Sequence, residues 1–155
     1  MIKVQKADFD VASLYQALCD NNQTGAVAMF VGRVRDFGDK PNQADSNKEE
    51  TLFELEHYPG MTEHNLQQIV DEAHSRWDLH EVQVVHRVGE LKVQDQIVFV
   101  GVSSSHRAEA FQACDFVMDY LKSRAAFWKK ETQSGKSQWV CAKESDEKSL
   151  ERWSN

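Results

Sequence analysis

Cysteine is scarce in this sequence. Only Cys19, Cys114 and Cys141 occur among 155 residues, and they lie far apart in the chain. Three cysteines without CxxC or Cys/His spacing form neither a disulfide framework nor a zinc motif. Two of them fall in apolar patterns, so we expect buried structural thiols there. The six histidines show no metal-ligand pattern, and we expect neither a metal nor a bound cofactor.

Long hydrophobic runs are absent as well. No apolar stretch approaches the roughly 20 residues that span a bilayer. The N-terminal sequence MIKVQKADFD has neither the apolar core nor the small-residue cleavage site of a signal peptide. We therefore expect a cytoplasmic protein.

Positive charge is in deficit, because 18 Lys and Arg stand against 25 Asp and Glu and give a formal net charge of -7. A nucleic-acid-binding domain is usually basic as a whole, so this balance disfavours that class. The length and the 41% hydrophobic content are those of one globular domain with a real core, and we expect residues 1–155 to form a single domain.

Hydrophobic periodicity predicts short strands that alternate with helices. The polar stretch 36–50 has no periodicity and is expected to be a mobile loop. Strands paired as hairpins, with helices inserted between them, predict an α+β fold rather than a parallel doubly wound one. The expected elements are strand 2–4, a helix from Asp8 or Asp10 to Leu18, a buried strand 25–34, strand 51–58, a helix from Thr62 to about 73, a hairpin of strands 81–89 and 96–104, a helix capped by Ser105 that ends near Arg124, a hairpin around 134–136, and a short helix carrying Leu150 and Trp153.

A cluster of cations interrupts this acidic chain. The stretch DYLKSRAAFWKK, residues 119–130, holds four cations with no acid between them, close to Phe127 and Trp128. Further cations lie near the ends of neighbouring predicted strands, at 33, 35, 106 and 107. Cations beside aromatic walls are suited to an anionic ligand.

Helix geometry places one of these cations beside apolar residues. At about 100° per residue, Lys122 lies roughly 20° from Phe111 and roughly 40° from Met118. We expect Phe111, Cys114, Met118 and Leu121 to form the apolar stripe of this helix. Lys122 then either snorkels to water at the helix end, or its charged form is disfavoured by the apolar walls and the other cations, which makes the amine more reactive.

The SSSHR stretch, residues 103–107, stands at a strand-to-helix junction, where free N–H groups can bind an anion. Taken alone, this stretch is better explained by plain helix capping. A Ser/His nucleophile pair would need an orienting acid, and none is identifiable. From the residues, the sequence indicates a site for an anionic small molecule with one or two lysines that take part in chemistry.

Six stretches, taken together and in this order, give the chain a resemblance to the large, catalytic subunit of molybdopterin synthase. They cover most of the chain from Gly25 to Trp153. The stretches are GAVAMFVGRVRDF, ELEHYPGMTE, HRVGEL, IVFVGVSSSHRAEAF, MDYLKSRAAFWKKE and WVCAKESD.

The resemblance implies an α/β-hammerhead-like fold and a sulfurtransferase activity. That family builds the dithiolene of molybdopterin, in molybdenum cofactor biosynthesis, from cyclic pyranopterin monophosphate (precursor Z). Sulfur arrives as a thiocarboxylate on the Gly-Gly C-terminus of a small ubiquitin-like subunit. The assembly is a heterotetramer, with a central homodimer of large subunits and a small subunit at each end.

The resemblance also assigns residues. Lys122 and Lys129 match the two important lysines of the family. Arg35, His106 and Arg107 match its anion-binding residues. Lys143 in WVCAKESD stands where relatives often carry arginine, and lysine keeps the charge but loses the bidentate fork. Some binding residues near that position come from the second subunit of the dimer.

Three other functions compete with this one. In the first alternative, the chain is a module that binds single-stranded RNA through aromatic and cationic side chains. In the second, it is a non-catalytic subunit that docks a ubiquitin-like partner. In the third, it is an enzyme that acts alone through a Schiff base. The acidic net charge disfavours the RNA-binding alternative.

Overall fold

The computed structural model describes residues 1–35, 52–133, 136–140 and 149–154. Three helices and eight strands, with a short helical turn at 149–151, make up this part, and its α+β class confirms the prediction. No helix within it is long and apolar enough to cross a membrane. The elements are β1 (Ile2–Gln5), α1 (Val11–Leu18), β2 (Ala26–Arg33), β3 (Leu52–His57), α2 (Met61–Arg76), β4 (Leu79–Arg87), β5 (Gly89–Leu91), β6 (Gln96–Ser104), α3 (Arg107–Arg124), β7 (Phe127–Gln133) and β8 (Lys136–Val140).

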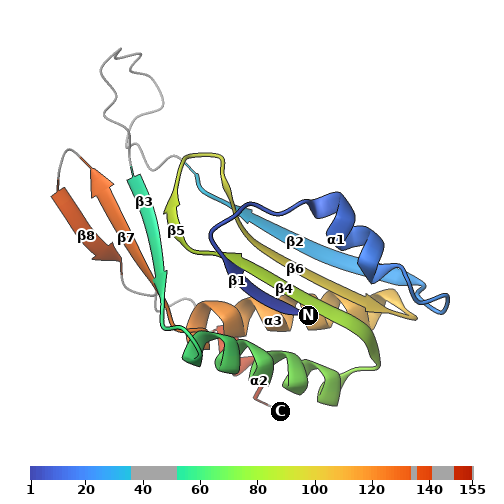
Figure 1. The fold of residues 1–155 in the computed structure, drawn as a ribbon. Helices are drawn as coiled ribbons and strands as arrows, with labels where there is room; N and C mark the ends of the chain where they lie inside the picture. Colours follow the sequence, from blue (N-terminus) through green and yellow to red (C-terminus); the bar gives the residue numbers. More distant parts are fainter. Residues whose placement is uncertain (36–51, 134–135, 141–148, 155) are drawn as a thin grey trace, which may run out of the picture.

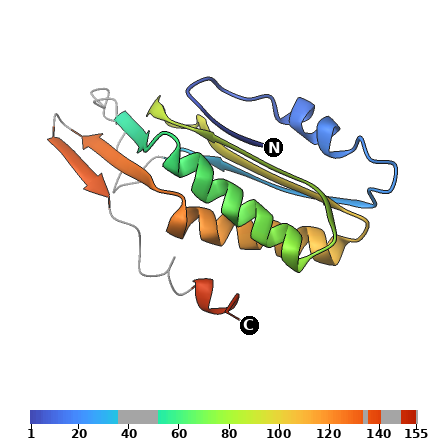
Figure 2. The same ribbon diagram turned by 60° about the horizontal axis from the view of Figure 1, so that its bottom comes forward.

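The first sheet has the strand order β1-β4-β6-β2. Strands β4 and β6 form the predicted antiparallel hairpin, and β2 pairs with β6. Strand β1 instead lies parallel to β4, so the sheet is mixed. Helices α2 and α3 cover one face, and α1 covers the other (Figures 1 and 2).

The main core lies between this sheet and the pair α2 and α3. Val84 and Val100, from the two central strands, are fully buried there. Leu66 from α2 and Val117 from α3 complete the contact, also with no exposed surface. Both central strands are covered on both faces, and each carries a run of valines: VQVV in β4 and VFVGV in β6. Such β-branched runs are why these strands were predictable.

The second sheet has the strand order β5-β3-β7-β8 and stands at one end of the first (Figure 1). Its buried side chains Phe53, Leu55 and Leu91 form a separate small core with Val34. Strand β5 was not predicted, because three residues are too few to show periodicity. It overlaps the short polar connection, residues 90–95, between the two strands of the predicted hairpin.

Two further expectations are corrected by the structure. The strand over 25–34 was expected to be buried, but β2 is an edge strand that leaves Met29 and Phe30 exposed. The N-cap of α3 is His106 rather than Ser105, whose hydroxyl instead lies 3.2 Å from Nε2 of His80. The loop predicted at 36–50 lies outside the described residues.

Candidate active site at the end of helix α3

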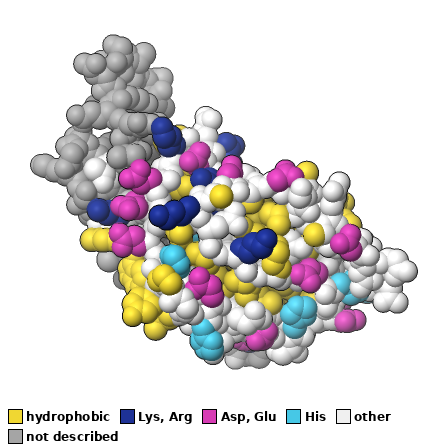
Figure 3. All heavy atoms as spheres, in the orientation of Figure 1, with side chains coloured by type: hydrophobic (Ala, Val, Ile, Leu, Met, Phe, Trp, Pro, Cys, Tyr) yellow, Lys and Arg dark blue, Asp and Glu magenta, His cyan; other side chains and the backbone are white. Residues whose placement is uncertain are grey.

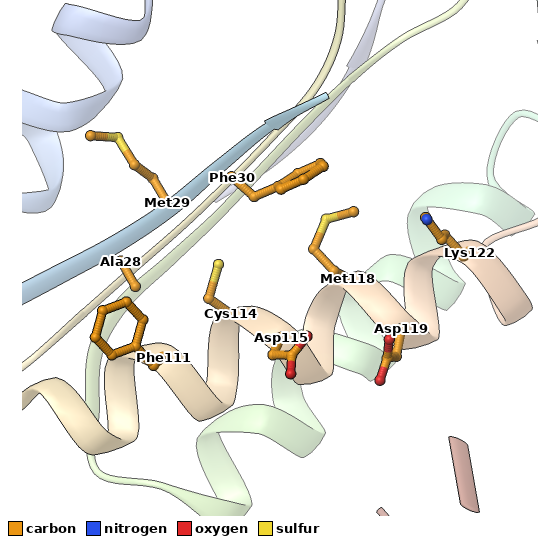
Figure 4. Close-up of a pocket in the computed structure, with 9 residues that line it drawn as sticks. All are labelled: Ala28, Met29, Phe30, Phe111, Cys114, Asp115, Met118, Asp119 and Lys122. Carbon is orange, nitrogen blue, oxygen red and sulfur yellow. The ribbon is translucent and has the colours of Figure 1, made fainter. Parts of the chain in front are cut away.

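A groove separates the edge strand β2 from α3. It has a volume of about 370 Å³, within the range of small-molecule sites. Its apolar lining includes Phe30 from the strand and Phe111, Cys114 and Met118 from the helix. In Figure 4 Phe30 extends over Met118, while Met29 points away from the helix. The groove therefore has an apolar body, open along the sheet edge.

Lys122 is the cation that lines this groove. It lies in the last turn of α3 and is exposed. Two carboxylates of the same helix, Asp115 and Asp119, are both paired with Arg152, at 2.8 and 2.5 Å. Within the described residues no ion pair engages the ammonium of Lys122 itself. Its charge is thus available to an anion in the groove.

Lys129 follows on β7, after the chain leaves α3 and turns. It pairs in register with Leu55 of β3, and its ammonium lies 4.9 Å from the centre of the Phe53 ring. That geometry is a cation–π contact over a buried ring. The neighbouring Lys130 points to the other face, where it lies 3.7 Å from Glu54 and 5.7 Å from the Trp139 ring.

Arg35 lies at the same end of the first sheet as these lysines. Register fixes this placement, because the C-terminal end of β2 pairs Arg33 with Gln96 at the start of β6. Helix α3 returns from the end of β6 and packs along β2 and β6, so its last turn comes back to that end. On the face seen in Figure 3, Lys and Arg side chains gather mainly towards the end that carries the second sheet.

His106 and Arg107 lie at the opposite end of α3. Both are exposed, and they precede or open the helix. Fifteen residues separate Arg107 from Lys122, which is roughly 22 Å along the axis at 1.5 Å per residue. The predicted site residues therefore form two groups within one chain. The two lysines and Arg35 form one group, and His106 and Arg107 form the other.

Burial sets the ionisation of two nearby groups. Desolvation, with a smaller contribution from the charge of Asp115, raises the pKa of the Cys114 thiol to about 11. That thiol is protonated at neutral pH and is not a nucleophile. Burial also lowers the pKa of His86 to about 4, so its ring is neutral. Within the described residues no group of three or more His, Cys, Asp or Glu side chains is placed to hold a metal ion.

The structure corrects the apolar stripe expected on α3. Phe111 is 67% exposed at the rim of the groove, and Met118 is only half-buried. The stripe that packs on the sheet includes Ala113, Val117 and Leu121. The prediction assumed that the large apolar side chains of α3 face the sheet. Small alanines instead allow the helix to lie close to the sheet, and the large Phe111 stays at the edge of the helix–sheet contact.

Some side chains of the site were missed and one predicted residue is not placed. Phe30 was taken as part of a buried strand, and Phe53 was not considered. The sequence does not show whether an aromatic side chain on a strand is exposed unless the strand is known to lie at the edge of its sheet. Lys143 and Cys141 lie outside the described residues.

Comparisons with known proteins all point to the same protein family. The family model described as MoaE protein matches residues 4–124. A molybdopterin synthase catalytic subunit from Vibrio cholerae is 50% identical over 152 residues, which cover 98% of this chain and 97% of that protein.

Solved structures give the same result. A molybdopterin biosynthesis MoaE protein from Burkholderia ambifaria superposes with a TM-score of 0.82 at 46% identity, covering 100% of this chain and 98% of that one. The molybdopterin synthase from Staphylococcus aureus superposes with a TM-score of 0.78 at 30% identity, covering 90% and 96%. With a family model that matches most of its length and relatives this similar, the chain belongs to the MoaE family, whose members include molybdopterin synthase catalytic subunits.

Proposed function

We propose that this protein is the catalytic subunit of a molybdopterin synthase. It transfers sulfur from a thiocarboxylated small subunit to precursor Z and so forms the dithiolene of molybdopterin. Family membership supports the reaction, and one observation carries the site: Lys122 opens onto a groove of about 370 Å³ whose walls are apolar apart from Asp115 and Asp119, both paired with Arg152. Aromatic and apolar walls suit a pterin, and a free ammonium suits its phosphate or a thiocarboxylate.

The donor of sulfur is a second protein. A subunit named catalytic implies at least one other subunit, and a ubiquitin-like tail ending in Gly-Gly is thin enough to enter a narrow groove. Its extended backbone can bond to a strand edge as an added strand does. Cys114, with its raised pKa, is no sulfur donor, and a thiocarboxylate from the partner removes the need for one.

Two lysines act on the reacting atoms in this proposal. Lys122 polarises the attacked carbon or forms a transient covalent link with it, and Lys129 assists by charge or proton transfer. Arg35 contributes to binding the phosphate at the same end of the sheet. Lys143 is a further phosphate contact, contributed across the dimer.

His106 and Arg107 join this site from a second copy of the chain. They are roughly 22 Å from Lys122 along α3, too far to share one small ligand within a chain. A twofold axis that crosses the middle of the groove would bring the start of one α3 beside the end of the other. The exposed Phe30 and Phe111 on either side of the groove supply apolar surface for that contact.

The proposed contact between two copies of the chain also defines the assembly. A homodimer of this chain forms the centre and binds a small subunit at each end, giving a heterotetramer. Residues 1–155 act as one domain, and the complex works in the cytoplasm. Sedimentation of the isolated chain tests the dimer, and cell fractionation tests the location.

Reconstitution tests the reaction itself. The chain is incubated with precursor Z and a thiocarboxylated partner, and molybdopterin is assayed by the fluorescence of its oxidised product. We expect product with the intact partner and none with a partner that lacks its two terminal glycines, which should also bind the dimer much more weakly. Product formation with the truncated partner would contradict the proposed route of sulfur.

A further inference from the structure

The two lysines are joined by a sharp corner of the backbone. Helix α3 ends at Arg124, and β7 begins at Phe127, only three positions later. Between them, Ala126 has a φ of 54°, a left-handed conformation that residues with a side chain rarely adopt. Such conformations persist where the surroundings hold them in place. The direction in which the chain leaves α3, and so the path to Lys129, is therefore set by whatever contacts this corner.

The first two turns of α2 make those contacts. The side-chain Nδ2 of Asn65 donates to the backbone oxygen of Arg124 at 3.0 Å, at the end of α3. The hydroxyl of Thr62 donates to the backbone oxygen of Ala126 at 3.2 Å. The same hydroxyl accepts from the backbone N–H of Tyr58 at 3.2 Å. Carbonyls at a helix end have no partner within the helix, so side chains from α2 satisfy them here.

Burial leaves the Thr62 hydroxyl with these two protein partners in place of water. Thr62 has no exposed surface, and its hydroxyl uses both its donor and its acceptor capacity. The turn that carries it is itself fixed, because the backbone N–H of Gly60 donates to Glu63 at 2.7 Å. The PGMTE stretch, which the reaction chemistry leaves without a role, is thus the part of the chain that reaches the corner.

A third contact holds the other side of the corner. The ring of His86 stacks on Phe127 with centroids 3.7 Å apart and an interplanar angle of 15°. Its Nδ1 lies 2.8 Å from the backbone oxygen of Arg87, which requires that Nδ1 carries the proton and donates. The start of β7 is therefore fixed from β4, while α2 fixes the end of α3.

We propose that Thr62 and Asn65 are positioning residues of the sulfur-transfer reaction: their hydrogen bonds hold the α3–β7 corner and with it the placement of the two lysines. Neither side chain needs to touch the substrate. The relative position of two catalytic groups matters because a displacement of about 1 Å can lower a rate by about a hundredfold. The lysines are catalytic only if the proposed function is right, so this role rests on that function.

Removal of one bond should loosen the corner without unfolding the protein. Asn65→Ala frees the carbonyl of Arg124 and lets the last turn of α3 shift relative to β7. We expect kcat to fall about tenfold or more, with KM for precursor Z and partner affinity within about twofold of wild type. A role in folding alone would lower the melting temperature and leave the kcat of the folded enzyme unchanged.

Two matched variants separate positioning from general damage to α2. Gln67→Ala removes a side-chain hydrogen bond of 2.7 Å to Asp71 on the same helix, away from the corner, and should leave kcat unchanged. Thr62→Ser keeps the hydroxyl and should retain near-normal kcat, whereas the isosteric Thr62→Val loses both bonds and should behave as Asn65→Ala does. If Thr62→Val fails to fold, the comparison of Asn65→Ala with Gln67→Ala is sufficient to test the positioning role.

The experiment measures molybdopterin formation and hydrogen exchange on the same proteins, each in complex with the thiocarboxylated partner. We expect Asn65→Ala to lower kcat and to speed amide exchange over 125–129, with no change of exchange in the central strands. An Asn65→Ala enzyme with the kcat of Gln67→Ala would overturn the positioning role, as would a lower kcat without faster exchange at the corner. If the wild-type chain makes no molybdopterin, the proposed function is wrong, whereas normal wild-type turnover with an unaffected Asn65→Ala removes only the positioning role.

Discussion

The ammonium of Lys129 lies 4.9 Å from the centre of the Phe53 ring, on the face of the second sheet that carries the small buried core. The next residue, Lys130, lies on the opposite face, with Glu54. Adjacent lysines of one strand therefore meet two different environments, one over a buried aromatic ring and one in a surface ion pair.

This difference predicts opposite outcomes for two similar substitutions. Lys129→Ala should lower turnover by about a hundredfold or more, because loss of a general acid or base costs about 10²- to 10⁴-fold. Lys130→Ala removes a surface ion pair, worth about 1 kcal/mol or less, and a contact with the exposed Trp139 ring, and should change turnover little. Rates with saturating partner decide between them, and equal losses in the two variants would remove the assignment of Lys129.

His106 and Arg107 should act in substrate binding from across the dimer. His106→Ala and Arg107→Ala each remove a hydrogen bond or a charge from the proposed phosphate site. We expect a raised apparent KM for precursor Z with little change of kcat, measured by initial rates at varied substrate. A pure loss of kcat with unchanged KM would contradict this role.

Mixed dimers test which chain supplies the pair. Chains with Lys122→Ala are mixed with chains that carry His106→Ala and Arg107→Ala together, at limiting substrate. If each site combines two chains, half of the dimers regain one intact site, and activity should recover to about a quarter of wild type. Sites contained within single chains would give no recovery. Mixing two batches of Lys122→Ala chains provides the blank.

His86 should make the stability of the fold depend on pH. Its pKa is lowered from 6.5 to about 4, chiefly by burial. Below pH 6.5 the unfolded chain therefore binds a proton that the folded chain does not. Stability is fully present above pH 6.5 and falls towards pH 4, by about 3 kcal/mol in all for this group.

The free energy of unfolding, measured by denaturant titration between pH 4 and 7, checks this effect. A His86→Phe variant keeps an aromatic ring on Phe127 but cannot titrate, and its curve should be flatter than that of wild type. His74→Gln, at an exposed position on α2, is the control. Parallel curves for wild type and His86→Phe would show that this ring does not cause the loss.

Much of the fold was predictable because its signals are local. The valine-rich β4 and β6 and the helical spacing of Leu66, Ile69 and Ala73 lead directly to the observed core. The edge position of β2 was not predictable, because it depends on strand order, which is a property of the whole sheet. The parallel pairing of β1 is non-local for the same reason.

The candidate site was predictable in its residue types but not in its arrangement. Cations beside aromatics identified Lys122 and Lys129. The separation of Arg107 from Lys122 was already present in the predicted length of the helix, and multiplying that length by the rise per residue would have found it. The bonds from Thr62 and Asn65 to the corner join segments about 60 positions apart, and no local pattern indicates them.

Molybdopterin formation by wild type and by Lys122→Ala is the measurement that tests the proposed function most directly. Both proteins are supplied with precursor Z and saturating thiocarboxylated partner, and partner binding is measured in parallel. Because Lys122 is exposed at a helix end, its truncation should leave the fold and the complex intact. We predict product from wild type and almost none from Lys122→Ala with undiminished partner binding. Near-normal product from Lys122→Ala would contradict the catalytic role of the groove.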